Sequence, residues 1–166
     1  MRNKGYLNSH WRLRMYHRDA LEPSDLKHIK WMWNKLAKEE LEMTVGDKLI
    51  EAVCKEVTEK TKDPAFLKDK FDEYLKLVEF FFVLEHDYRP MGFMAVKGEM
   101  VLSLWVIPVH RGFGKGRFLI ANHREIFNKP LEVQCYRNNA KGIRFYESAG
   151  FNVIDATGLY TRLRLD

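Results

Sequence analysis

The chain has 166 residues, of which 46% are hydrophobic and 31% charged, and its formal net charge is +5. This length fits one domain, residues 1–166, with a sizeable core, and the apolar fraction argues against a disordered chain. The longest apolar run, residues 80–84, is too short to cross a bilayer, and the polar N-terminus lacks the apolar core of a signal peptide. We therefore expect a cytoplasmic protein without membrane association, and the excess of basic residues favours an anionic partner.

The cysteines and histidines show no metal-ligand spacing. Cys54 and Cys135 are not part of a C-x-x-C pair, and the six histidines are scattered along the chain. We expect a reducing compartment and no bound metal, and we expect His110 and His123 to lie at the surface.

The first half begins with one strand and continues with helices. In residues 10–17 apolar and polar side chains alternate, which predicts a strand with Trp11, Leu13 and Met15 facing inward. Three helices are then expected in the segment 24–78: one after Pro23, one capped by Asp47 and one that starts at Asp63. The charges of the last helix are mixed, which is not typical of a nucleic-acid-binding helix.

The second half alternates strands and helices. Strands are predicted at 80–86, 91–97 and 100–107, with turns short enough for an antiparallel meander. A helix at 114–129, a strand at 131–136 and a helix at 138–150 follow, and then two strands at 151–156 and 159–166. This order indicates a mixed α/β domain.

Three alternate glycines, Gly112, Gly114 and Gly116, follow the third strand of the meander and open a helix. The stretch matches neither a Walker A loop nor a Rossmann G-x-G-x-x-G motif. Glycines let backbone N–H groups approach a ligand closely, and a first helical turn has unpaired N–H donors that suit a phosphate. The alternative is a glycine-rich turn that caps the helix and binds nothing.

Two segments resemble landmarks of the GNAT acetyltransferase superfamily. Residues 111–116, RGFGKG, resemble its R/Q-x-x-G-x-G/A signature directly after a strand. Residues 138–151, NNAKGIRFYESAGF, resemble its N-x-x-A-x-x-x-Y-x-x-x-G-F segment, with Gly142 where Ala is usual. The resemblance covers residues 80–166 and implies the α/β GNAT fold, with a mixed, mostly antiparallel central sheet flanked by helices. The helical segment after the first strand is enlarged by one helix, which would shape either the acceptor site or a dimer contact.

The resemblance also implies site residues. The backbone amides of the glycine loop would hold the pyrophosphate of acetyl-CoA, and the strand before it would bind the pantetheine arm, with the Val106 N–H polarising the thioester carbonyl. Asn139 would contact the cofactor, and Tyr146 would protonate the leaving thiolate. The implied cofactor-binding residues are therefore Leu104, Trp105, Val106, Arg111, Gly112, Phe113, Gly114, Lys115, Gly116 and Asn139.

The general base is the least defined residue. An attacking amine must be neutral, and a free lysine with a pKa of ~10.4 is almost fully charged near neutral pH. Some relatives use a glutamate at the position of Gln134, which cannot accept a proton. Glu132 lies two residues earlier on the same strand face and is the first candidate. The other candidates are Glu85, His86 and Glu99.

The expected activity is acetyl transfer from acetyl-CoA to a primary amine by direct attack in a ternary complex. The acceptor would be a protein N-terminus, a lysine or a small amine. Two alternatives stay open: an acetyltransferase that acts on aminoacyl-tRNA, and an acyl-CoA-binding regulatory module without turnover. A nucleic-acid partner is therefore conceivable but not favoured, and a homodimer is left open.

Overall fold

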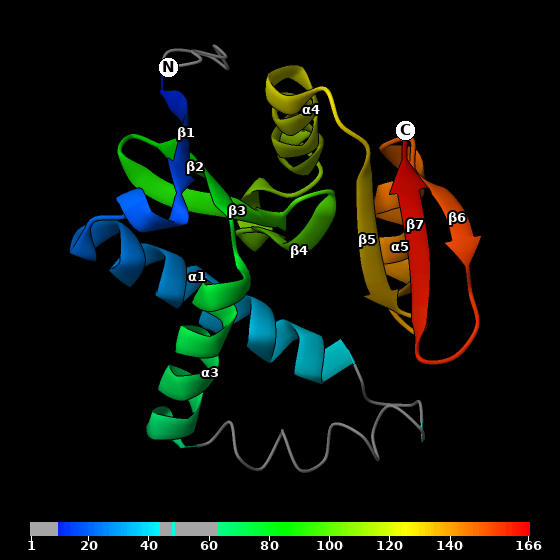
Figure 1. Cartoon of the computed structure of the whole chain (residues 1–166), viewed down its shortest axis with the longest axis horizontal. Coiled ribbons are helices and arrows are strands. Elements are labelled where there is room, and N and C mark those ends of the chain that lie inside the picture. Colours follow the sequence, from blue (N-terminus) through cyan, green and yellow to red (C-terminus); the bar gives the residue numbers. More distant parts are fainter. Residues whose placement is uncertain (1–9, 44–47, 49–62) are drawn as a thin grey trace. The chain divides into compact units, whose positions relative to one another are not determined.

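The structure is a computed structural model that describes residues 10–43, 48 and 63–166. The chain divides into two compact units, residues 1–32 with 78–130 and residues 33–77 with 131–166. Figure 1 shows the elements in chain order. The helix predicted from Asp47 lies outside the described residues, and the single domain stays a prediction.

The first unit contains a four-stranded antiparallel meander. Its strands are β1 (Trp11–His17), β2 (Phe80–His86), β3 (Arg89–Lys97) and β4 (Met100–Val106), and each pairs with the next. The β2–β3 turn holds Asp87 and Tyr88, both with positive φ, and the β3–β4 turn holds Gly98. The meander predicted from the short turns is confirmed.

A helix lies against each face of this meander. α4 (Lys115–Phe127) covers the face of Phe82, whose ring lies 5.7 Å from that of His123. The first part of α1 (Pro23–Met43) covers the opposite face, where the Trp31 ring meets the Trp105 ring edge to face. Side chains on one face of the meander therefore point toward α4, and those on the other face point toward the first part of α1.

The second unit contains a three-stranded antiparallel sheet in the order β5 (Leu131–Tyr136), β7 (Tyr160–Leu165), β6 (Asn152–Asp155). α5 (Ala140–Ser148) packs against it, as Figure 1 shows. α3 (Pro64–Leu77) starts where predicted, because the Asp63 carboxylate accepts a hydrogen bond of 2.8 Å from the Ala65 N–H. Its Phe71 packs against Trp33 of α1.

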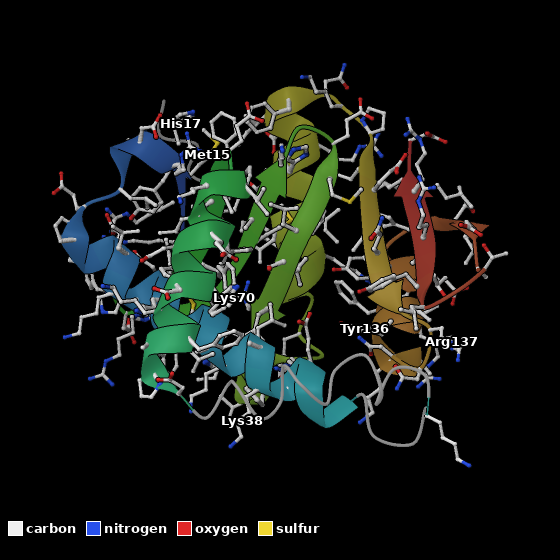
Figure 2. All side chains as sticks on the ribbon, turned by 60° about the horizontal axis from the view of Figure 1, so that its bottom comes forward. Met15, His17, Lys38, Lys70, Tyr136 and Arg137 are labelled. Atoms are coloured by element: carbon white, nitrogen blue, oxygen red, sulfur yellow. The ribbon has the colours of Figure 1, made fainter. Side chains whose placement is uncertain are left out.

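Three residues differ in burial from what the sequence analysis indicated. Met15, labelled in Figure 2, is 38% exposed, because β1 has only β2 as a neighbour among the described strands. Met32 of α1 is fully buried, although the sequence analysis did not name it among the inward-facing residues. His123 is 1% exposed, because it lies on the inner side of α4 against Phe127. None of the described helices is both long and apolar enough to span a membrane.

Candidate functional site

Two residues of the glycine loop have a backbone conformation that favours glycine. After β4 the chain makes one 3-10 turn at Pro108–His110, and α4 then begins at Lys115. Gly112 has φ 80° and Gly114, the residue before the helix, has φ 74°, so both adopt a left-handed conformation that favours glycine. A Cβ on either residue would meet nothing within 4 Å. These two glycines are therefore required by backbone conformation, and the space above them is open.

Several backbone N–H groups of the loop have no backbone acceptor among the described residues. His110 and Arg111 donate to carbonyls of the preceding turn, and Phe118 donates to Gly114. Within the described part of the chain, residues 112–117 show no such bond, and no side chain caps α4. A helix of 13 residues thus presents uncapped donors and the positive end of its dipole to one open loop. This arrangement suits a phosphate or diphosphate.

Two basic side chains fix this loop to the strands behind it. Arg111 Nε donates a hydrogen bond of 2.7 Å to the Val106 carbonyl oxygen, which ties the loop to the end of β4. Lys115 Nζ lies 3.9 Å from the centre of the Trp11 ring, and burial lowers the pKa of this lysine. The same Trp11 ring contacts the rings of His86 and His110. His110 is therefore half-buried in an aromatic cluster, which the scattered positions in the sequence did not reveal.

The end of β4 lies directly against a glycine of β3. Gly92 pairs with Val106, and a Cβ at Gly92 would lie 2.8 Å from the Trp105 carbonyl oxygen and 3.2 Å from the Val106 Cα. Gly92 therefore permits a close approach of the two strands where Leu104, Trp105 and Val106 are expected to bind the cofactor. The sequence analysis missed this residue, although a lone glycine inside a strand is a usual signal of such an approach.

Tyr146 lies in the second unit and is almost completely enclosed. Its residue is 7% exposed, on α5, and its ring contacts those of Phe145 and Phe151. Burial, reinforced by Cys135 and Glu40, raises its pKa, so the phenol keeps its proton near neutral pH. Such a group can donate a hydrogen bond to a thiolate that forms beside it.

Asn139 caps the same helix. Its Oδ1 accepts a hydrogen bond of 2.9 Å from the Gly142 N–H. A Cβ at Gly142 would lie 2.6 Å from the Asn139 amide nitrogen, so this side-chain conformation requires glycine there. Gly142 stands where the resembled GNAT segment usually has Ala, and the close Asn139 side chain gives a steric reason for this difference. The cap occupies the Asn139 oxygen and leaves its amide group to contact a ligand.

Glu132 is held in an ion-pair network on β5. Its carboxylate accepts bonds from Arg164 at 2.7 Å and Arg162 at 3.1 Å, and these bonds lower its pKa. Alternation along the strand places it on the face opposite Cys135, the neighbour that influences Tyr146. The two arginines belong to β7, so these ion pairs link β5 to β7. The role of Glu132 as the general base stays a prediction.

The other candidate bases lie at opposite ends of the meander. Glu99 precedes β4, so it stands about 23 Å along the strand from Val106, at roughly 3.3 Å per residue. His86 ends β2 at the edge that carries the glycine loop, in the cluster with Trp11. Glu85 is 7% exposed and lies on the α1 face of the sheet.

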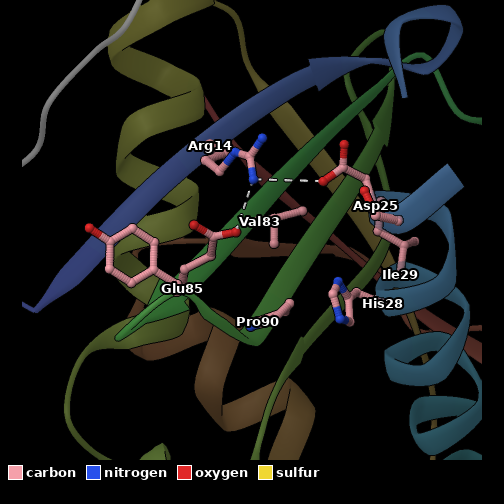
Figure 3. Close-up of a pocket in the computed structure, with 9 residues that line it drawn as sticks. Arg14, Asp25, His28, Ile29, Val83, Glu85 and Pro90 are labelled. Carbon is pink, nitrogen blue, oxygen red and sulfur yellow. Dashed lines mark hydrogen bonds and ion pairs between the residues drawn. The ribbon is translucent and has the colours of Figure 1, made fainter. Parts of the chain in front are cut away.

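Glu85 belongs to a pocket that the sequence did not indicate (Figure 3). The pocket lies between β1, the start of α1 and the β2–β3 turn, wholly inside the first unit. Arg14 crosses it, with its guanidinium nitrogen 3.3 Å from Glu85 and 3.7 Å from Asp25. Residues from four elements meet there, so no local sequence motif could reveal it. Among the described residues, no group of three or more His, Cys, Asp or Glu side chains is arranged to hold a metal ion.

Comparison with known proteins gives a family for the second half of the chain. Residues 78–153 match the family model of the acetyltransferase (GNAT) domain. The peptidyl-lysine N-acetyltransferase YiaC of Escherichia coli strain K12 is 30% identical over 76 residues, which are 44% of this chain and 50% of that protein. The peptidyl-lysine N-acetyltransferase YjaB of Salmonella typhimurium strain LT2 is 27% identical over 114 residues, which are 65% of this chain and 77% of that protein. The chain thus spans about half the length of the first of these relatives.

A solved structure shows the fold over most of the chain. The PaiA N-acetyltransferase of Thermoplasma acidophilum, in complex with coenzyme A, superposes with a TM-score of 0.62 at 19% identity. The match covers 92% of this chain and 97% of that chain. The α/β fold class predicted from the two motifs is therefore confirmed, including the part of the chain that precedes them.

Proposed function

Because residues 78–153 match the acetyltransferase (GNAT) domain and the chain has the fold of a solved N-acetyltransferase, we propose that it transfers an acetyl group from acetyl-CoA to a primary amine. The observation that carries this proposal is the uncapped start of α4, where the amides of residues 112–117 make no bond to the described chain. These donors suit the diphosphate of coenzyme A, and Arg111 holds the loop at the end of β4.

The proposed reaction is a direct attack in a ternary complex. The neutral amine nitrogen attacks the thioester carbonyl carbon, a C–N bond forms, and the C–S bond breaks with its electron pair leaving on sulfur. The nitrogen gives up one proton to a base, and the sulfur receives one. The Val106 N–H would polarise the carbonyl, and Tyr146 would donate to the sulfur.

The environment of Tyr146 defines what it contributes. A thiol has a pKa of ~8.5, below that of a phenol, and burial raises the pKa of Tyr146 further. The hydroxyl therefore stays protonated and stabilises the departing thiolate first by a hydrogen bond. Complete protonation of sulfur follows as the coenzyme leaves.

Protein lysine is the acceptor to test first, because two relatives are named peptidyl-lysine N-acetyltransferases. The test is incubation of the full chain with isotopically labelled acetyl-CoA and separate pools of protein, small amines and aminoacyl-tRNA, followed by mass spectrometry. Label in lysine side chains is expected, and it must disappear when the enzyme is omitted. If calorimetry shows that coenzyme A binds but no pool carries label, the acetyl-transfer proposal fails. The chain would then be an acyl-CoA-binding module without turnover.

A further inference from the structure

The inner face of α1 carries a carboxylate near its C-terminal end. Three apolar residues and one glutamate recur on this face at helical spacing: Ile29, Trp33, Leu36 and Glu40. Ile29 is 1% exposed, and the Trp33 ring packs against that of Phe71 in α3. The apolar stripe of the helix therefore ends in Glu40, at a position where a further apolar residue would continue it.

The Glu40 carboxylate has no hydrogen bond and no cationic partner within the described part of the chain. Its residue keeps an exposed surface, but the surrounding protein removes much of the hydration of the carboxylate. This desolvation, followed by the like charge of Glu39, raises the pKa of Glu40 to about 7. Glu132 and Glu85 are in contrast each held by an arginine. Of these three carboxylates, Glu40 is the one that can take up a proton near neutral pH.

Glu40 lies near the tyrosine of the proposed reaction. Glu40, Cys135 of β5 and Tyr146 of α5 belong to the same compact unit. Beyond the effect of burial, the Glu40 charge raises the pKa of the Cys135 thiol and that of the Tyr146 hydroxyl, and a charge has such an effect only at short range. Cys135, with its pKa raised to about 12, stays a thiol and is no nucleophile. The cluster thus offers one ionisable carboxylate beside one protonated phenol.

The reacting atoms of the proposed transfer would lie close to this cluster. The departing sulfur lies at the Tyr146 hydroxyl in that reaction, and the carbonyl carbon is bonded to the sulfur. The attacking nitrogen must come within about 3–3.5 Å of this carbon. A carboxylate near Tyr146 can therefore reach the nitrogen directly or through one water.

We propose that Glu40 is the general base that removes the proton from the attacking amine. The inference rests on the proposed acetyl transfer and adds the residue that accepts the proton. The N–H bond breaks with its electron pair left on nitrogen, and an O–H bond forms on a Glu40 carboxylate oxygen. Tyr146 acts on the sulfur, so the acid and the base have separate partners. The exposed surface of Glu40 lets the proton pass to solvent.

The pH dependence of turnover tests this role. Steady-state kcat/KM of the full chain is measured from mildly acidic to alkaline pH, with acetyl-CoA and the acceptor that takes up label in the experiment above. We expect an acidic limb near pH 7 in wild type, where the base loses its proton. Glu40→Gln should lose this limb and lower kcat about a hundredfold or more, while Glu40→Asp keeps the limb. A limb that persists unchanged in Glu40→Gln would overturn the proposal.

Glu39→Gln is the matched control, because it removes the neighbouring carboxylate of the same helix. The charge of Glu39 raises the pKa of Glu40, so its removal is expected to move the acidic limb to lower pH while the limb itself persists. A merely structural role of Glu40 would predict no such shift. Calorimetry is expected to show that Glu39→Gln and Glu40→Gln bind coenzyme A as tightly as wild type does. Disappearance of the limb in Glu39→Gln would contradict the assignment.

Carbon-13 NMR of the glutamate side-chain carboxyl groups gives a readout that needs no turnover. One resonance of wild type is expected to titrate near pH 7 and to be missing from the spectrum of Glu40→Gln. If Glu40→Gln does not fold, the shift of this titration to lower pH in Glu39→Gln makes the same assignment. Titration of Glu40 at the ordinary pKa of a glutamate would overturn the proposal.

The two measurements separate failure of the base from failure of the proposed function. Wild type that transfers acetyl, with a Glu40→Gln profile like its own, would remove Glu40 as the base and leave acetyl transfer intact. Wild type that transfers no acetyl to any acceptor would refute the proposed function, and the role of Glu40 as its base would fall with it.

Discussion

Tyr146 is the side chain whose surroundings fit one chemical role best. Its ring contacts those of Phe145 and Phe151, and its hydroxyl retains its proton because burial raises its pKa. We predict that Tyr146→Phe keeps the affinity for coenzyme A and lowers kcat about a hundredfold or more, as expected for loss of a proton donor. Calorimetry and steady-state rates measure the two effects, and an unchanged kcat would remove the role. Phe145→Leu, next to it on the same helix, is the control for a packing effect.

Glu132 shows how a strand position can suggest a role that the tertiary contacts do not favour. Arg164 and Arg162 satisfy its carboxylate and lower its pKa, so it accepts a proton poorly near neutral pH. We predict that Glu132→Gln leaves the pH profile of kcat/KM unchanged and lowers the melting temperature. Loss of the acidic limb, in which kcat/KM rises with pH as the base loses its proton, would instead make Glu132 the base. Asp155→Asn, in strand β6 on the other side of β7, is a matched control for loss of a carboxylate.

At the scale of elements, the start of α4 is a helix end that no side chain of the described residues caps. Gly114→Asp would place a carboxylate at the unbonded amides and occupy them, so we predict loss of coenzyme A affinity. The substitution also strains a backbone with φ 74°. Gly158→Asp imposes the same strain in the β6–β7 turn, at φ 81° with open space around it, and is expected to retain the affinity. Full affinity in Gly114→Asp would refute the loop assignment.

The pairing of β3 with β4 depends on one glycine. A Cβ at Gly92 would lie 2.8 Å from the Trp105 carbonyl oxygen, so Gly92→Ala must displace the end of β4. We predict a loss of stability of about 1–3 kcal/mol, as for other overpacked sites, together with weaker binding of coenzyme A. Val101→Ala, near the opposite end of β4, lowers stability by a cavity and is expected to leave affinity intact. Equal effects of both variants on affinity would contradict a specific role of Gly92.

At the scale of the whole molecule, acid stability depends on a histidine that folds in its neutral form. Burial lowers the pKa of His123 to about 4 from an ordinary 6.5, and its Nδ1 has no hydrogen-bond partner among the described residues. Below pH 6.5 the His123 imidazole binds a proton in the unfolded chain but not in the folded chain. The free energy of unfolding therefore falls between pH 6.5 and about 4. The difference between the pKa of His123 in the unfolded and in the folded chain corresponds to at most about 3 kcal/mol of unfolding free energy.

We therefore predict that His123→Leu flattens the decrease in unfolding free energy over this pH range. Urea unfolding at several pH values measures the effect. His28→Gln changes an exposed histidine and is expected to keep the decrease of wild type. An unaltered slope in His123→Leu would show that other groups govern acid unfolding.

Local patterns predicted most of the described elements, because alternation, helical spacing, glycine and proline act within a few residues of the chain. The starts of α3 and α4 and the β2–β4 meander follow from such signals. Burial was predicted less well where it depends on a neighbouring element, as at Met15 and Met32. His123 appeared polar and therefore exposed, yet the inner face of α4 encloses it against Phe82 and Phe127.

The sequence alone determined the glycine loop, the segment around Tyr146 and the resemblance of residues 80–166 to the GNAT acetyltransferases, because each is encoded by residues close together along the chain. Only the tertiary structure decided which partners the charged groups have. It pairs Glu132 with arginines of β7, and it gathers Arg14, Asp25 and Glu85 from three elements into one pocket. Charges act through space over a few ångströms, and residues dozens of positions apart come within that range only when the chain has folded.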